Sequence, residues 1–130
     1  MGRSATSSIG YGVILDNFEG DYAEGVYDVV QDKYNSDDDF DFGDWVNDTL
    51  KLAGVMAEID YFGFEYSGQI LVVNGTVTEF YDTVAVIDPR NIANGDDDEE
   101  HENILQEALT ALGFSNLGLE GAWHLYVTVS

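Results

Sequence analysis

Histidine and carboxylate side chains are the first candidates for catalysis or metal binding, because the sequence contains no cysteine and therefore has no thiolate metal site or thiol nucleophile. A zinc hydrolase helix needs two histidines four residues apart, with a glutamate directly after the first. His101 and Glu102 supply the first half of that pattern, but Leu105 stands where the second histidine should be. His124, the other histidine, lies alone in an expected strand. The spacing therefore predicts no zinc site.

Glycines and paired carboxylates are the next candidates for chemistry. Gly10 and Gly12 begin like a dinucleotide-binding fingerprint, but no third glycine follows at the required spacing. We expect these glycines to bend or thin a strand instead. Among 26 Asp and Glu residues many close carboxylate pairs arise by chance, so no single pair indicates acid–base catalysis. We predict a protein that is not an enzyme and that uses no cofactor.

Calcium is a separate possibility, because aspartates crowd residues 37–48. Counted from Asp37, the first, third and fifth positions of an EF-hand loop are acidic. The glycine required at the sixth position falls at the seventh, as Gly43, and the twelfth position is Asp48 rather than glutamate. We predict no specific metal site and favour diffuse attraction of cations, with weak calcium binding at residues 37–48 as the alternative.

Charge is the feature of the composition that bears most directly on function. The 26 acidic residues against four Lys and Arg give a formal net charge of −22. Duplex DNA carries one charge per roughly 1.7 Å, so the same charge occupies about 37 Å of duplex. A compact domain of this length has a diameter of roughly 36 Å. We therefore exclude ordinary binding to nucleic acids or anionic membranes, and expect a basic protein, cations or solvent to face this surface.

Apolar spacing in the first half of the chain predicts one strand and two helices. Ile9, Tyr11, Val13 and Leu15 alternate along a strand over residues 9–15. Residues 21–34 follow helical spacing, with an apolar face formed by Tyr22, Ala23, Val26, Tyr27, Val30 and Tyr34. A second helix over residues 42–53 has Asp41 as its cap and Gly54 as its stop, with Trp45, Val46, Leu50 and Ala53 facing the core.

The second half predicts three strands, a helix and a final strand. Ala57, Ile59 and Tyr61 alternate until the phase shifts at Gly63, where we expect a bulge. Asn74-Gly75 predicts a hairpin joining residues 69–73 to residues 76–88. The clearest helix has a core face of Ile104, Leu105, Ala108, Leu109 and Leu112, and we place residues 96–100 in a loop and its first turn. Trp123, Leu125, Val127 and Val129 form the expected buried face of the last strand.

The predicted fold is α+β, in the order β-α-α-β-β-β-α-β. We expect a mainly antiparallel sheet of about five strands with three helices packed on it. Residues 1–8 form a flexible N-terminal arm and residues 9–130 a single acidic domain. No apolar run is long enough to cross a bilayer, and the first residues lack the apolar segment of a signal peptide. We therefore expect a cytoplasmic protein.

Acids of the first helix and of the following cap form the predicted partner-binding surface. Its residues are Asp21, Glu24, Asp28, Asp32, Asp37, Asp38, Asp39, Asp41, Asp44 and Asp48. A secondary acidic patch consists of Asp96, Asp97, Asp98, Glu99 and Glu100. Phe40, Phe42 and Trp45 lie among the first set and could add contact energy at an interface. The expected partner is a basic protein that binds nucleic acids; the oligomeric state stays open.

The strand Gly10-Tyr11-Gly12-Val13-Ile14-Leu15, the acidic helical middle and the ending Trp123-His124-Leu125-Tyr126 resemble small accessory proteins of tailed phages. Some of those proteins are DNA mimics that block host restriction, CRISPR or repair enzymes. The resemblance implies an inhibitor that acts in the host cytoplasm, but it assigns no functional residue. The alternatives are adaptation to high salt, where acidic surfaces keep proteins soluble, and a phage structural or assembly module without DNA mimicry.

Overall fold

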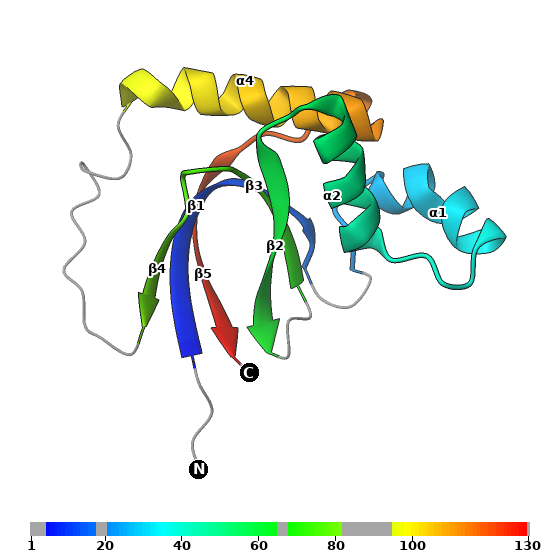
Figure 1. Cartoon of the computed structure of the whole chain (residues 1–130), viewed down its shortest axis with the longest axis horizontal. Helices are drawn as coiled ribbons and strands as arrows, with labels where there is room; N and C mark the ends of the chain where they lie inside the picture. The colour runs from blue at the N-terminus through cyan, green and yellow to red at the C-terminus, as the bar shows by residue number, and fades with distance from the viewer. Residues whose placement is uncertain (1–4, 18–20, 65–67, 82–94, 130) are drawn as a thin grey trace, which may run out of the picture.

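The computed structural model describes residues 5–17, 21–64, 68–81 and 95–129 (Figure 1). Its elements are β1 (Ala5–Asp16), α1 (Val26–Ser36), α2 (Phe42–Ala53), β2 (Ala57–Phe64), β3 (Gly68–Val73), β4 (Thr78–Tyr81), α4 (Gly95–Leu112), the 3-10 turn η1 (Ser115–Leu117) and β5 (Ala122–Val129). This order confirms the predicted α+β fold, and the described residues form three α-helices and a mostly antiparallel five-stranded sheet. Within the described ranges, no helix is both long and apolar enough to cross a membrane.

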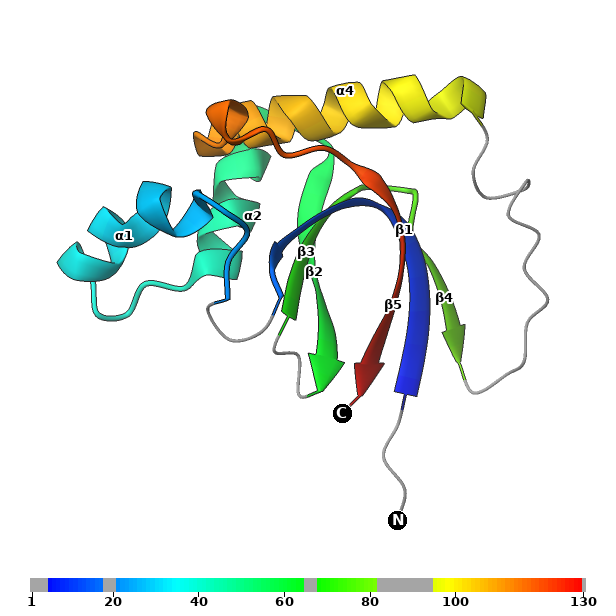
Figure 2. The same ribbon diagram turned by 180° about the vertical axis from the view of Figure 1, so that it is seen from behind.

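The sheet is strongly curved, and β1, the longest of the described strands, runs through the bend (Figure 2). Residues 6–9 of β1 pair antiparallel with β4 on one edge and with β5 on the other, and residues 12–16 pair with β3. β2 pairs antiparallel with β3, while Gly63 and Phe64 at its end pair in parallel with β5. Because β3 bonds to both β1 and β2, the strands β1, β3, β2 and β5 close into a ring.

A close approach of β1 to β3 requires glycine at position 12. A Cβ atom placed on Gly12 would lie 2.0 Å from the backbone oxygen of Leu71, a separation that no side chain tolerates. At Gly10 the nearest atom would be Cγ2 of Val77, at 3.0 Å. The structure thus places both glycines inside a strand, as predicted, where they let neighbouring chain segments pack closely.

The hairpin predicted at Asn74-Gly75 is wrong. The turn forms, with Gly75 in the left-handed region at φ 84°, but it does not fold β4 back onto β3. Val72 pairs with Gly12 and Thr78 pairs with Ile9, so β3 and β4 follow one another along the same edge of β1. The segment from β3 to β4 therefore follows the bend of β1 and stays paired with that strand on both sides of the turn. Residues 82–88 of the predicted strand lie outside the described residues.

The main core lies between the helices and the outer face of the sheet. The alternation predicted for β1 is confirmed, because Ile9, Tyr11, Val13 and Leu15 are all buried. On α4 the buried residues are Leu105, Ala108, Leu109 and Leu112, and Ile104 packs at their margin. Val26, Val30, Val46, Leu50 and Phe114 complete the centre of this core. Helices α2 and α4 therefore cover the outside of the curled sheet (Figure 1).

A second, smaller core fills the inside of the curl and reverses the prediction for β5. Tyr126 is buried there with Ile70 and Val72, whereas Leu125 is 67% exposed and Val127 is 42% exposed. The tyrosine hydroxyl donates to Oδ2 of Asp60 at 2.6 Å, so this polar atom is satisfied inside the sheet. The alternation correctly identified the strand, but Tyr126 on its other face fills the inner core, and only Trp123 of the predicted face packs against the main core.

Two segment boundaries also differ from the prediction. β1 begins at Ala5, so residues 5–8 are strand rather than arm, because they pair with β5. α1 begins at Val26 rather than Asp21, because Tyr22 forms a β-bridge with Asp16 and the amide of Ala23 donates to the carbonyl of Leu15. Tyr22 and Ala23 are therefore paired with the end of β1, and the helix starts after them.

α2 has the predicted boundaries. Its first turn is capped by Asp41, whose Oδ1 accepts a hydrogen bond from the amide of Asp44 at 3.0 Å. Gly54 ends the helix in the left-handed region, at φ 72°. Val46 and Leu50 face the core as predicted, but Ala53 in the last turn is exposed. The strong local cap and stop signals placed this helix correctly, while its last residue extends beyond the core.

Candidate partner-binding surface

The acids predicted to bind a partner are exposed, although they do not form the predicted helical stripe. Asp28 and Asp32 lie on α1, and Asp44 and Asp48 lie on α2. The others are in the connecting segments, and all are exposed: Asp21, Glu24, Asp37, Asp38, Asp39 and Asp41. Because Asp21 and Glu24 precede α1, the stripe on that helix is half as long as expected. We call residues 21–48 the acidic end of the molecule.

Two carboxylates of the acidic end also hold the backbone in place. Oδ1 of Asp37 accepts the amide of Asp39 at 3.0 Å, and Oδ1 of Asp41 caps α2. These are turn and cap contacts of the kind that aspartate makes with neighbouring amides. In the parts of the chain that the structure describes, no three His, Cys, Asp or Glu side chains are grouped to hold a metal ion.

Aromatic rings pack directly behind these acids. The ring of Tyr27 lies 5.9 Å from Tyr22 and 6.1 Å from Tyr34, and Tyr34 meets Phe40 edge-on at 4.7 Å. Phe42, predicted as an interface residue, is instead buried in the core, where it touches Tyr22 and Phe114. Phe40 and Trp45 are half-buried. The amphipathic tyrosines, rather than Phe42, therefore form the aromatic part of the surface.

A cavity of about 520 Å³ opens among these tyrosines. Its lining includes the three tyrosine rings together with Phe40, Asp41 and Gln69. The hydroxyl groups of Tyr22 and Tyr34 share a hydrogen bond. Burial raises the pKa of Tyr22, and the bond to Tyr34 and the nearby Asp16 raise it further. Burial likewise raises the pKa of Tyr61 below α2, with smaller effects from Asp41 and Asp44. These phenols stay neutral beside the carboxylates.

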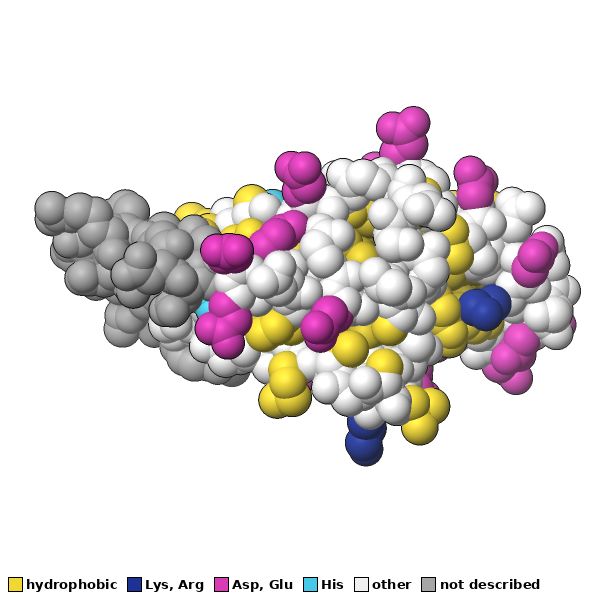
Figure 3. Space-filling model, turned by 90° about the horizontal axis from the view of Figure 1, so that it is seen from above, with side chains coloured by type: hydrophobic (Ala, Val, Ile, Leu, Met, Phe, Trp, Pro, Cys, Tyr) yellow, Lys and Arg dark blue, Asp and Glu magenta, His cyan; other side chains and the backbone are white. Residues whose placement is uncertain are grey.

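Acidic side chains are not confined to residues 21–48. Viewed from the α4 side, they are scattered over the visible face and along its edges rather than gathered in one patch (Figure 3). Glu99, Glu100, Glu107 and Glu120 are exposed in this half. The run Asp96 to Glu100 is helical throughout, because α4 begins at Gly95 rather than within it. The side chains of Asp96, Asp97 and Asp98 lie outside the described part of the structure.

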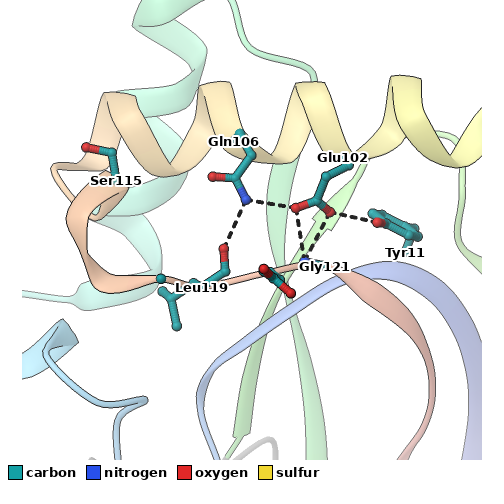
Figure 4. Close-up of a pocket in the computed structure, with 8 residues that line it drawn as sticks. Tyr11, Glu102, Gln106, Ser115, Leu119 and Gly121 are labelled. Carbon is teal, nitrogen blue, oxygen red and sulfur yellow. Dashed lines mark hydrogen bonds between the residues drawn. The ribbon is translucent and has the colours of Figure 1, made fainter.

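Glu102 forms a different kind of carboxylate site (Figure 4). It receives the Tyr11 hydroxyl at 2.7 Å, the amide of Gly121 at 3.1 Å and the side-chain amide of Gln106 at 2.8 Å. A Cβ atom on Gly121 would lie 2.6 Å from Oε2 of Glu102, so the backbone approaches the carboxylate only because this residue is glycine. Glu102 therefore ties α4 to β1 and to the segment before β5.

His101, the neighbouring histidine, is held between two aromatic rings. Its ring lies 5.6 Å from Tyr11 and 5.9 Å from Trp123. Its Nδ1 atom is buried and has no hydrogen-bond partner among the described residues. A cavity of about 440 Å³ adjoins Glu102, but the carboxylate facing it already accepts three different donors. The arrangement joins elements of the fold rather than presenting a free acid or base.

Neither the tyrosine cavity nor the Glu102 network was predicted from the sequence. A partial signal was present at the cavity, because tyrosines rather than leucines occupy positions 22, 27 and 34 of the predicted apolar face. Such residues suit a surface that is partly wet. Searches with this sequence and structure found no matching family model, curated protein or solved structure.

Proposed function

We propose that this chain is a non-enzymatic acidic binding protein that inhibits a basic, nucleic-acid-handling enzyme by occupying its nucleic-acid groove. The observation that carries the proposal is the acidic end, residues 21–48, whose ten carboxylates are all exposed. Lys33 and Lys51 are the only Lys or Arg residues in the described ranges, and Nζ of Lys33 lies 5.2 Å from the centre of the Trp45 ring. Few positive side chains therefore neutralise the negative charge of this end, and that charge can attract a basic partner.

The spacing of the helical acids supports a resemblance to phosphates over a short distance. Asp28 and Asp32, like Asp44 and Asp48, are four residues apart, which is about 6 Å along a helix axis. Phosphates recur every roughly 3.4 Å along one DNA strand, so one helix supplies about half their density. Two helices and the loop between them supply further rows. A groove lined with Lys and Arg would be attracted to this field and, once filled, would exclude DNA.

An affinity capture under two salt conditions tests this proposal. The immobilised chain is exposed to a nuclease-treated lysate of the host cell at low and at moderate salt, and bound proteins are then challenged with duplex DNA. We expect a nucleic-acid-binding protein that persists at moderate salt and is displaced by the DNA. Capture of only proteins that DNA does not displace would contradict the proposal, as would recovery of no nucleic-acid-binding protein.

Adaptation to high salt is a second candidate, which the spread of acids over the α4 half favours. Self-repulsion among surface carboxylates would then destabilise the fold when salt is low, and screening would restore it. Thermal unfolding measured from low to molar salt separates the two proposals. A fold that is stable at about 0.1 M salt agrees with the inhibitor, whereas a fold that needs molar salt favours the solubility role.

A further inference from the structure

We infer that the tyrosine cavity of the acidic end receives an arginine side chain of the partner. This inference rests on the proposed function, because it names the group of the basic partner that the surface recognises. The cavity lies between the loop before α1, the helix itself and the start of α2. Its size, about 520 Å³, is ample for one long side chain.

The ring arrangement favours an organic cation. Cations bind over aromatic faces within about 6 Å of the ring centre. The rings of Tyr22, Tyr27 and Tyr34 succeed one another at 5.9 and 6.1 Å with their planes 30° and 26° apart, so they offer a flat cation a group of similarly oriented rings. The protein already uses this contact nearby, where Nζ of Lys33 lies 5.2 Å from the centre of Trp45. The aromatic group is thus suited to positive charge.

Hydrogen-bond acceptors around the cavity favour a guanidinium over an ammonium group. Asp16 and Asp41 contribute carboxylates to its lining, and Gln69 contributes an amide. The buried Oε1 atom of Gln69 accepts no hydrogen bond from any described residue. A ligand donor that reaches this buried acceptor would satisfy it. Guanidinium offers five donors in one plane and also stacks on aromatic rings, which lysine does not do equally well.

Tyr27 and Asp41 allow the inference to be tested without disturbing the core. Tyr27 is 47% exposed, so replacing its ring does not open a buried cavity. Tyr27→Leu removes the aromatic face, whereas Tyr27→Phe keeps it. Asp41→Asn removes the charge beside the cavity and retains an oxygen that can cap α2. Glu107→Gln removes the same charge from an exposed helical position outside the acidic end and is the control.

The probe is N-acetyl-L-arginine amide, titrated into the full chain and followed by NMR of the tyrosine rings and the Gln69 amide. The neutral analogue N-acetyl-L-citrulline amide and the tetramethylammonium ion serve as comparisons. We expect arginine, but not citrulline, to shift these signals. Tyr27→Leu should weaken binding roughly two- to thirtyfold and Asp41→Asn about two- to fivefold, while Tyr27→Phe and Glu107→Gln leave the affinity close to that of the natural sequence.

Three results would overturn the inference: equal binding of citrulline, tighter binding of tetramethylammonium than of arginine, or equal losses for Asp41→Asn and Glu107→Gln with no effect of Tyr27→Leu. Failure of the probe to bind, while a DNA-displaceable partner is still captured, would remove the arginine site and leave the proposed function. Binding of the probe without any such partner would leave the cation site and remove the proposed function.

Discussion

Carboxylates in the acidic end and in the Glu102 network differ in their exposure and in the number of hydrogen bonds that they accept. At residues 21–48 they are exposed, and those that bond locally, such as Asp37 and Asp41, each accept one neighbouring amide. Glu102 is half-buried and accepts donors from a tyrosine, a backbone amide and a glutamine. Asp60 follows the second pattern, because it accepts the hydroxyl of buried Tyr126.

The acidic residues therefore have at least two roles: some hold the fold together by hydrogen bonds, and others give the surface its negative charge. A carboxylate removed from water must find donors, and their loss leaves polar groups unpaired inside the fold. An exposed carboxylate keeps its water and contributes little to stability, so its charge is available for a partner. The two groups should therefore respond oppositely to substitution: one in the free energy of unfolding, the other in binding.

Glu102→Ala should have the largest effect on stability. It leaves the Tyr11 hydroxyl, the Gly121 amide and the Gln106 amide without their acceptor, and we expect a loss of about 3 kcal/mol in the free energy of unfolding. Glu107→Ala, on an exposed position of the same helix, should change it by less than about 0.5 kcal/mol. Urea unfolding measures both, and equal effects would break the distinction between the two kinds of carboxylate.

Tyr126→Phe should remove part of the alkaline sensitivity of the fold. Burial, followed by the hydrogen bond to Asp60, raises the pKa of Tyr126 above the usual 10.0, so the folded chain holds this proton more tightly than the unfolded chain. That stabilisation is complete below pH 10 and is lost as the pH rises from there towards the folded pKa.

We expect the stability of the natural sequence to fall steeply above pH 10, by up to about 1.4 kcal/mol per pH unit for this group. The phenylalanine variant should be less stable by roughly 1 kcal/mol at neutral pH, where the hydroxyl bond is missing, and its stability should fall less steeply above pH 10. Urea unfolding at several pH values measures both slopes. Parallel curves would show that the Tyr126–Asp60 bond does not control the alkaline response.

Substitution of Asp41 should lower stability by a smaller amount, and this loss should depend on the side-chain oxygen that caps α2 rather than on the charge. Asp41→Ala removes the cap of α2 and should cost about 1 kcal/mol, whereas Asp41→Asn should cost much less. Asp48→Ala should be close to neutral, because this residue is exposed in the middle of the helix. Thermal melts of the three variants are sufficient, and a loss of stability in Asp41→Asn equal to that in Asp41→Ala would mean that charge dominates at the cap.

Local signals made the fold class and α2 predictable. Asp41 and Gly54 define that helix without help from distant residues, and the alternation of β1 reflects one face of one strand. The errors involve partners far away in the sequence. Tyr22 and Ala23 have helical spacing but pair with the end of β1, and the Asn74-Gly75 turn does not reveal that β4 continues along β1.

The sequence likewise predicted one feature of the candidate site, the exposure of its acids, but neither the tyrosine cavity nor the Glu102 network. The exposure of the acids was predictable, because aspartates in loops and on polar helix faces rarely have the donors needed for burial. The tyrosine cavity brings residues 22, 27, 34 and 69 together, and the Glu102 network joins residues separated by up to 91 positions. Such groupings depend on the tertiary packing of several elements, which no spacing in the sequence encodes.

The most direct test of the acidic end compares two variants of equal charge. One carries Asp28→Asn, Asp32→Asn, Asp44→Asn and Asp48→Asn, and the other carries Glu58→Gln, Glu99→Gln, Glu107→Gln and Glu120→Gln at exposed positions elsewhere. Each is used to capture the DNA-displaceable partner at moderate salt. We predict that the first variant loses the partner and the second retains it. Equal retention or equal loss in the two variants would contradict a binding surface at residues 21–48.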